Sequence, residues 1–179
     1  MNTDPTGMCL GPYCTLRCKT NSQSNNAYRP NSKPRDVTRK VNAVLLPAAE
    51  EARLSRTTVN DMAINDRFYG EMEIYIEFFT MVTHEGDWDI KRKASWNNTI
   101  DLIFPGRGAA IIYEGVLMTP ECLGNYTYGY LGASYGFPQE AIILGSYAAA
   151  GFPNRGKDFY NEHIDQSYVL AGYKDGLSK

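Results

Sequence analysis

The chain contains little histidine and no long apolar run. Only two of its 179 residues are histidines, His84 and His163, and neither stands in an HExxH pattern, so the sequence gives no sign of a histidine-based zinc site. No run of 18 apolar residues occurs, and we therefore expect no transmembrane span. The first thirty residues also lack the basic-then-apolar pattern of a signal peptide. If the domain leaves the cell, another part of the delivery machinery is expected to carry it.

Two further catalytic signatures are missing, and the charge is distributed unevenly. The sequence has no Gly-x-Ser-x-Gly nucleophile elbow and no phosphate-cradling GxxxxGK[ST] loop. Residues 1–40 carry a net charge of +5, whereas residues 41–179 carry −7. Since nucleic-acid affinity comes largely from Lys and Arg that neutralise phosphates, the acidic main part argues against a nucleic-acid partner. The basic segment 29–40 is more typical of a solvated linker.

Four cysteines are present, three of them close together. Cys9, Cys14 and Cys18 have spacings that are unusual for zinc, and no histidine lies nearby, so we expect neither a metal nor another cofactor. The fourth, Cys122, lies far along the chain. A disulfide between the N-terminal tail and Cys122 would fit an oxidising compartment. Free thiols remain an equal alternative at this stage.

Composition divides the chain into a linker at residues 1–36, rich in Asn, Ser, Pro and Thr, and a domain at residues 37–179. Helical spacing of apolar residues begins at Val37, and Pro47 is expected to kink or restart that first helix. A second, longer helix is expected after Asn60 or Asp61. Its predicted core face consists of Ile64, Phe68, Met72, Tyr75, Ile76, Phe79 and Val82.

The second half of the domain predicts one β element and two more helices. Residues 99–104 and 109–113 have the character of short strands, joined by a Pro-Gly-Arg-Gly turn into a hairpin. Pro138 suits the first turn of a helix that extends to about Ala149, and a final helix is expected over residues 158–173. The predicted fold class is therefore mainly α (α+β), a helical single domain with one small β-hairpin. This arrangement allows a lysozyme-like layout.

Residues 124–136 form the most distinctive segment, with four tyrosines, four glycines and one asparagine. Glycine lets a second backbone or a ligand approach closely, and tyrosine combines apolar area with a polar group. Glu121 lies three residues before the first glycine. The segment therefore fits either a close helix–helix contact or one wall of a binding site.

Carboxylates are the best supply of catalytic groups in this chain. Two carboxyl groups held across a site can hydrolyse a glycosidic bond, one as general acid and the other as base or nucleophile. Burial against aromatic rings would raise the pKa of the acid. Most acidic residues of any protein are simply solvated, however. The candidates that lie in or beside Gly- and aromatic-rich segments are Asp87, Asp89, Glu114, Glu121, Glu162 and Asp165.

Two parts of the chain resemble known sequences. The motif Asp4-Pro5-x-Gly7 resembles the junction between an Rhs repeat shell and its variable C-terminal toxin, in which case Met1 is an added start. Residues 70–175 resemble the bacterial polymorphic toxin type 44 family in their ordered motifs, although residues 84–87 and the expected hairpin depart from that pattern. The resemblance implies functional roles for Trp88, Asp89, Lys91, Glu121, Asn125, Tyr128, Asp165 and Gln166.

The resemblance also implies a biological setting. It implies a type VI secretion effector, delivered within an Rhs shell by the secretion apparatus, and a cognate immunity protein in the producer. With the acidic domain and the carboxylate supply, we expect a hydrolase of peptidoglycan glycan strands that acts in the target periplasm. Glu121 is the expected general acid, with Asp89 or Asp165 as its partner. The expected substrate-binding residues are Trp88, Lys91, Asn125, Tyr128, Gln166 and His163.

Two other functions stay open from the sequence. One is a cytoplasmic, metal-independent ribonuclease that uses His163 or His84 together with Lys91 and Arg92. The other is a binding module without catalysis, whose tyrosine-rich surface docks a sugar or a protein. Toxicity that depends on export would distinguish the wall hydrolase from the ribonuclease, and digestion products would distinguish either enzyme from the binding module.

Overall fold

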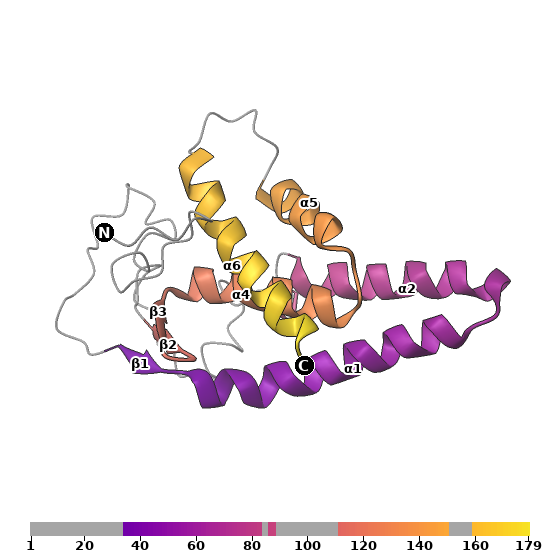
Figure 1. The fold of residues 1–179 in the computed structure, drawn as a ribbon, viewed down its shortest axis with the longest axis horizontal. Helices are drawn as coiled ribbons and strands as arrows, with labels where there is room; N and C mark the ends of the chain where they lie inside the picture. Colours follow the sequence, from indigo (N-terminus) through magenta and orange to yellow (C-terminus); the bar gives the residue numbers. More distant parts are fainter. Residues whose placement is uncertain (1–33, 84–85, 89–110, 151–158) are drawn as a thin grey trace.

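A computed structural model describes residues 34–83, 86–88, 111–150 and 159–179 of the chain. These residues form five helices and a three-stranded mixed sheet (Figure 1), which confirms the mainly helical fold class. The expected hairpin strand at residues 99–104 and the candidates Asp89 and Lys91 lie outside the described residues. A lysozyme-like layout and the division into a linker and a domain stay predictions.

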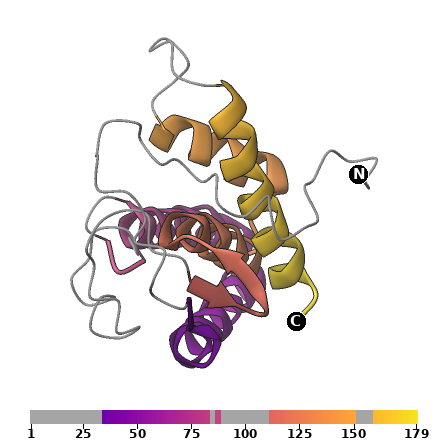
Figure 2. The ribbon, with the colours of Figure 1, turned by 90° about the vertical axis from the view of Figure 1, so that its left-hand side faces the viewer.

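The small sheet lies beside the N-terminal end of α4 (Pro120–Ser134), the central helix of the molecule (Figure 2). Its strands are β1 (Arg35–Asp36), β2 (Ile111–Tyr113) and β3 (Val116–Met118), in the order β1-β2-β3. Strand β1 pairs in parallel with β2, and β2 pairs antiparallel with β3. The turn between β2 and β3 has positive φ at both Glu114 (50°) and Gly115 (76°), as a two-residue type I′ hairpin requires.

The hairpin prediction was therefore displaced along the chain. The strand that ends at Tyr113 is confirmed, but its antiparallel partner is β3, which follows it, and β1 occupies its other edge. The sequence signal that went unused was the Glu114-Gly115 dipeptide between two apolar triplets. The glycine suits the second position of this turn, because glycine carries no Cβ and adopts positive φ without strain.

Helix α1 (Thr38–Asp61) continues through Pro47, so the expected restart at this residue was wrong, and the expected kink stays a prediction. The physical reason is the position of the proline, which lies on the exposed side of the helix. The carbonyl of Ala43, four residues earlier, loses its helical partner but is also on the exposed side, where water can satisfy it. The core side of α1 has helical spacing and consists of Val41, Leu45, Ala49, Ala52 and Val59.

Helix α2 (Ile64–Val82) confirms the predicted helix but not its predicted core face. It begins after Ala63 without a side-chain cap, so Asn60 and Asp61 belong to the end of α1. Its buried residues are Gly70, Ile74 and Phe78. Of the face that was expected to be buried, five residues are instead exposed: Ile64, Phe68, Met72, Ile76 and Phe79.

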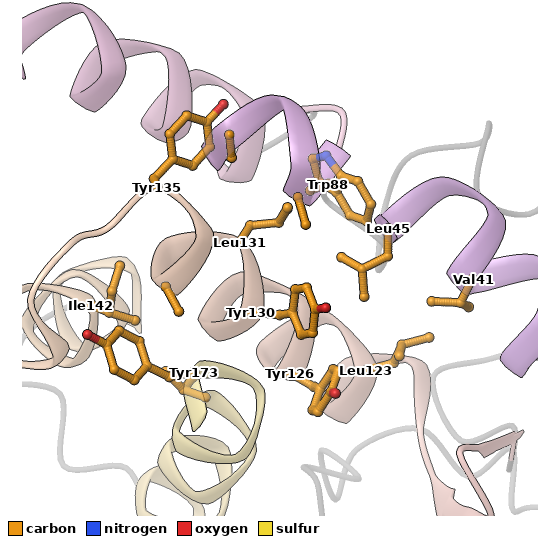
Figure 3. Packing of buried hydrophobic residues seen from close by; sticks show 14 of the residues in the cluster. Val41, Leu45, Trp88, Leu123, Tyr126, Tyr130, Leu131, Tyr135, Ile142 and Tyr173 are labelled. Atoms are coloured by element: carbon orange, nitrogen blue, oxygen red, sulfur yellow. The ribbon is translucent and has the colours of Figure 1, made fainter. Parts of the chain in front are cut away.

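The central element is α4 (Pro120–Ser134), which is buried on most of its circumference. Helix α1 lies along one side of it, and α6 (Phe159–Leu177) lies across another side, with α5 (Gln139–Ala150) packed beside α6 (Figure 1). Figure 3 shows Leu123, Tyr130 and Leu131 of α4 within the hydrophobic cluster. The predicted helices over 138–149 and 158–173 are confirmed, the second extending to Leu177. Among the described helices, none combines the length and apolar character of a membrane span.

Candidate functional site

The first half of α4 presents Glu121, Asn125 and Tyr128 on one side of the helix. Their spacing of four and then three residues places them above one another on successive turns. The helix begins sharply here because the Thr119 hydroxyl accepts a hydrogen bond from the Cys122 N–H at 3.2 Å and Pro120 occupies the first turn. Glu121, which is partly exposed, adds a carboxylate to that first turn, where the helix dipole favours negative charge.

Glycines bring α6 into backbone contact with α4. A Cβ on Gly129 would meet the carbonyl of Val169, and a Cβ on Gly172 would meet the carbonyl of Tyr126. The Gly/Tyr segment therefore does form the close helix–helix contact that was one of its two interpretations. Gly172 lies against Tyr126, and Gly176, four residues on, lies against the Tyr130 carbonyl, so the two helices run in the same direction.

This packing places two amide side chains at the same level of the α4–α6 contact. Asn125 is one turn before Gly129, and Gln166 is one turn before Val169, the residue that Gly129 contacts. Gln166 is only 8% exposed. Its Nε2 donates to the Ser146 Oγ of α5 at 2.5 Å, and that hydroxyl donates to the Ile143 carbonyl at 2.7 Å. Residues Asn125, Tyr128, Ser146 and Gln166 are called the polar cluster below.

Two atoms of the polar cluster are buried without a hydrogen-bond partner in the described part of the chain. They are the Asn125 Nδ2, a donor, and the Gln166 Oε1, an acceptor. A buried polar group without a partner costs about 1–3 kcal/mol, so each of these atoms calls for a hydrogen bond to a bound water, ion or ligand group. One donor and one acceptor at the same helix contact fit a ligand that carries both kinds of group.

The Tyr128 side chain is held by contacts within the fold. Its hydroxyl donates to the Ile142 carbonyl of α5 at 3.1 Å, and its ring lies 5.4 Å from that of Phe78. Burial raises the pKa of this phenol to about 12, so Tyr128 stays protonated and cannot serve as a base near neutral pH. A Cβ on Gly145 would come within 2.5 Å of the hydroxyl, and this explains the glycine at that position. The contacts show Tyr128 joining α4 to α5.

Trp88 belongs to the hydrophobic cluster. It is buried, and its backbone N–H donates to the Met81 carbonyl at 2.8 Å. Figure 3 shows its indole near Leu45 of α1. This packing role does not test the expected contact with substrate, which stays a prediction.

The other candidates are placed only by their chain position. His163 and Asp165 belong to the first half of α6, but the structure does not describe their side chains. Asp89 and Lys91 lie outside the described residues altogether. Within the described residues the structure therefore brings together Asn125, Tyr128 and Gln166, with Glu121 on the same side of α4. Ser146 was missed, because nothing in the sequence around it indicates that α5 reaches Gln166.

Cys122 adds information on redox state. It is fully buried beside Glu121 in the chain and is disulfide-bonded. Its partner is not among the described residues, in which Cys122 is the single cysteine. Of the two states that the sequence left open, the structure contains the disulfide. Among the described residues, no three His, Cys, Asp or Glu side chains group in a way that could hold a metal ion.

Comparisons with known proteins identify the family. Neither the curated proteins nor the solved structures contain a match to the chain. A family model described as Bacterial toxin 44 matches residues 77–177, a range that holds α4, the polar cluster and the whole of α6. Because this range is more than half of the chain, the protein belongs to the Bacterial toxin 44 family.

Proposed function

We propose that this toxin domain is a hydrolase that cleaves the glycan strands of peptidoglycan by carboxylate acid–base catalysis. The observation that carries the proposal is the unpartnered donor and acceptor of the polar cluster, on the Asn125 Nδ2 and the Gln166 Oε1. An acetamido group offers the complement, one carbonyl acceptor and one N–H donor. The N-acetylated sugars of peptidoglycan carry this group, and the two amides would fix such a sugar along α4.

The catalytic step is assigned to carboxylates near the same side of α4. Glu121 lies one turn before Asn125 and is the proposed general acid that protonates the leaving glycosidic oxygen. Its partner, the base or nucleophile, is Asp165 or Asp89. Asp165 directly precedes Gln166 in α6, and Asp89 directly follows Trp88. Each candidate is therefore next to a residue whose position the structure describes, and both lie within the matched range 77–177. Trp88, Lys91 and His163 keep their proposed contacts with the substrate.

The disulfide of Cys122 supports a periplasmic target. Disulfides persist in oxidising compartments such as the bacterial periplasm and are rare in the cytosol. We therefore propose that the domain is delivered as a secreted effector, within an Rhs shell, into the periplasm of a target cell. A cognate immunity protein of the producer would then block the site by complementary shape and charge.

The test is Glu121→Gln, with Glu140→Gln as the matched control. Glu140 is an exposed carboxylate in the first turn of α5, so the two variants remove the same charge at comparable helix positions. We expect Glu121→Gln to lower the release of reducing ends from purified peptidoglycan at least 10²-fold, the lower range for loss of a general acid. The control should retain wild-type activity, and both should keep the wild-type circular dichroism spectrum.

Expression with and without a secretion signal completes the test. The wall hydrolase should kill only when it is exported, whereas the alternative ribonuclease should kill from the cytoplasm and degrade RNA. Full toxicity of the exported Glu121→Gln protein, or killing without export, contradicts the proposal. Toxicity without any digestion product would instead favour the binding module.

A further inference from the structure

Helix α2 presents an apolar stripe to solvent along its whole length. The stripe consists of six large side chains, and the exposed fractions of its first members are 83% for Ile64, 66% for Phe68 and 69% for Tyr69. The remaining three each expose at least 46% of their surface. Helical spacing keeps all six on one side of the helix, opposite the buried Gly70, Ile74 and Phe78. The α2 stripe is Ile64, Phe68, Tyr69, Met72, Ile76 and Phe79.

The stripe is large enough for a specific protein contact. Three of its six members are aromatic, and an aromatic side chain alone contributes about 150–250 Å², so the stripe presents on the order of 800 Å². One partner's share of a stable protein–protein interface is also about 800 Å². The largest apolar patch of an ordinary monomer is about 300–600 Å², and larger patches mark interaction sites.

A row of carboxylates runs along one edge of the stripe. Asp66, Glu73 and Glu77 are spaced by seven and then four residues, which aligns them on the side of α2 next to Tyr69 and Ile76. All three are exposed, and none forms an ion pair with a described residue. An acidic border of this kind favours a partner with positive charge at the matching edge.

The stripe and the polar cluster lie on different sides of α2, because the buried Phe78 packs 5.4 Å from the Tyr128 ring whereas the stripe is on the exposed side of the helix. The stripe covers the outer side of the α1–α2 hairpin, whose turn forms the far end of the molecule in Figure 1, away from β2 and β3. Most of the stripe, from Ile64 to Ile76, also precedes the family match at residues 77–177. The contact is thus a property of this chain's N-terminal hairpin rather than of the matched toxin region.

We infer that the α2 stripe docks a protein partner through an amphipathic helix whose apolar face is bordered by lysine or arginine. A second copy of the chain fits less well, since α2 contains four acidic residues and Arg67 as its one basic residue. Pairing two α2 helices would set carboxylates beside carboxylates, and like charges at an interface oppose association. A basic-edged helix instead satisfies both the apolar area and the carboxylate row.

Two synthetic helical peptides test the inference on the full chain. Both carry the same leucine face, and one has lysines along its edge where the other has glutamates. We expect fluorescence anisotropy to show the lysine-edged peptide binding at least tenfold more tightly than the glutamate-edged one, with a preference that shrinks at high salt. Met72→Asp should weaken binding of the lysine-edged peptide at least tenfold. A combined D66N/E73Q/E77Q variant should bind the two peptides with equal affinity.

Leu54→Asp is the matched control, because Leu54 is an exposed leucine on α1 and lies outside the stripe. It should leave peptide binding unchanged, and circular dichroism should show that every variant stays folded. Equal binding of the two peptides, or none, would overturn the inference. Two other results would also overturn it. One is a wild-type dimer in sedimentation equilibrium that dissociates in the Met72→Asp variant. The other is an affinity for phosphatidylcholine vesicles equal to the affinity for the lysine-edged peptide.

Discussion

At the scale of single residues, Arg56 joins three elements through one side chain. Its guanidinium donates to the Glu71 carboxylate of α2 at 2.5 Å and to the Tyr135 carbonyl, just after α4, also at 2.5 Å. The same group lies 5.6 Å from the centre of the Phe137 ring. A planar guanidinium serves all three partners at once, which a single ammonium group does not.

We predict that Arg56→Met destabilises the fold although it retains an apolar stem. Hydrogen bonds to charged groups contribute about 1.5–3 kcal/mol each when buried, and partial exposure of this pair lowers the expected loss to about 1–3 kcal/mol. Urea unfolding followed by circular dichroism measures it. Arg39→Met, an exposed arginine of the same helix, should change stability by less than about 0.5 kcal/mol. Equal effects of the two substitutions would contradict this role of Arg56.

Residue spacing predicted only part of the candidate site. Glu121, Asn125 and Tyr128 share a side of α4 because of local helical spacing, and such spacing is legible in the sequence. Gln166 reaches the level of Asn125 only because Gly129 and Gly172 let two helices touch. Contact between distant segments leaves no local periodicity, so the hydrogen bond of Gln166 to α5 could not be predicted.

At the scale of elements, the α4–α6 contact depends on glycines. We predict that Gly129→Ala lowers the free energy of unfolding by at least about 2 kcal/mol, because its Cβ would meet the Val169 backbone and the helices would have to separate. Gly70→Ala is the matched helical control. There the Cβ meets side-chain atoms and no backbone, the Met62 Sδ at 2.7 Å and the Val59 Cγ2 at 3.0 Å, and the better helix propensity of alanine offsets part of that crowding.

Thermal unfolding of the two variants checks this prediction. Gly129→Ala should melt well below the wild type, whereas Gly70→Ala should melt close to it. If the two variants melted alike, helix propensity rather than backbone contact would govern these positions. A Gly129→Ala variant that folds should also lose activity on peptidoglycan, since the level of Asn125 relative to Gln166 depends on the same contact.

Helix α2 shows why element type is easier to predict than element orientation. Apolar residues at a period of 3.6 identify the helix between residues 64 and 82, and this was confirmed. The same helix carries Ile74 and Phe78 on one side and the α2 stripe on the other. When apolar residues occupy both sides, periodicity cannot select the core face, so the side that packs on α1 could not be chosen from sequence.

At the scale of the whole molecule, buried tyrosines link stability to alkaline pH. Burial is the main cause that raises the pKa of Tyr113, Tyr126, Tyr128 and Tyr135 above the ordinary value of 10.0. Nearby carboxylates raise these pKa values further. Glu114 acts in this way on Tyr113, and Asp175 accepts a hydrogen bond from the Tyr126 hydroxyl at 2.9 Å. The folded state therefore holds these protons more tightly than the unfolded chain does.

The sign of the pH effect follows from that difference in affinity. Groups whose pKa is raised in the folded state contribute stability that is fully present below about pH 10 and is lost as pH rises further. Stability should thus fall steeply between about pH 10 and 12, by up to about 1.4 kcal/mol per pH unit for each such tyrosine. Urea midpoints measured across this range test the prediction. Tyr128→Phe should reduce the slope of stability against pH by the share of one tyrosine, up to about 1.4 kcal/mol per pH unit. A flat profile up to pH 12 would mean that burial does not keep these phenols protonated in the folded state.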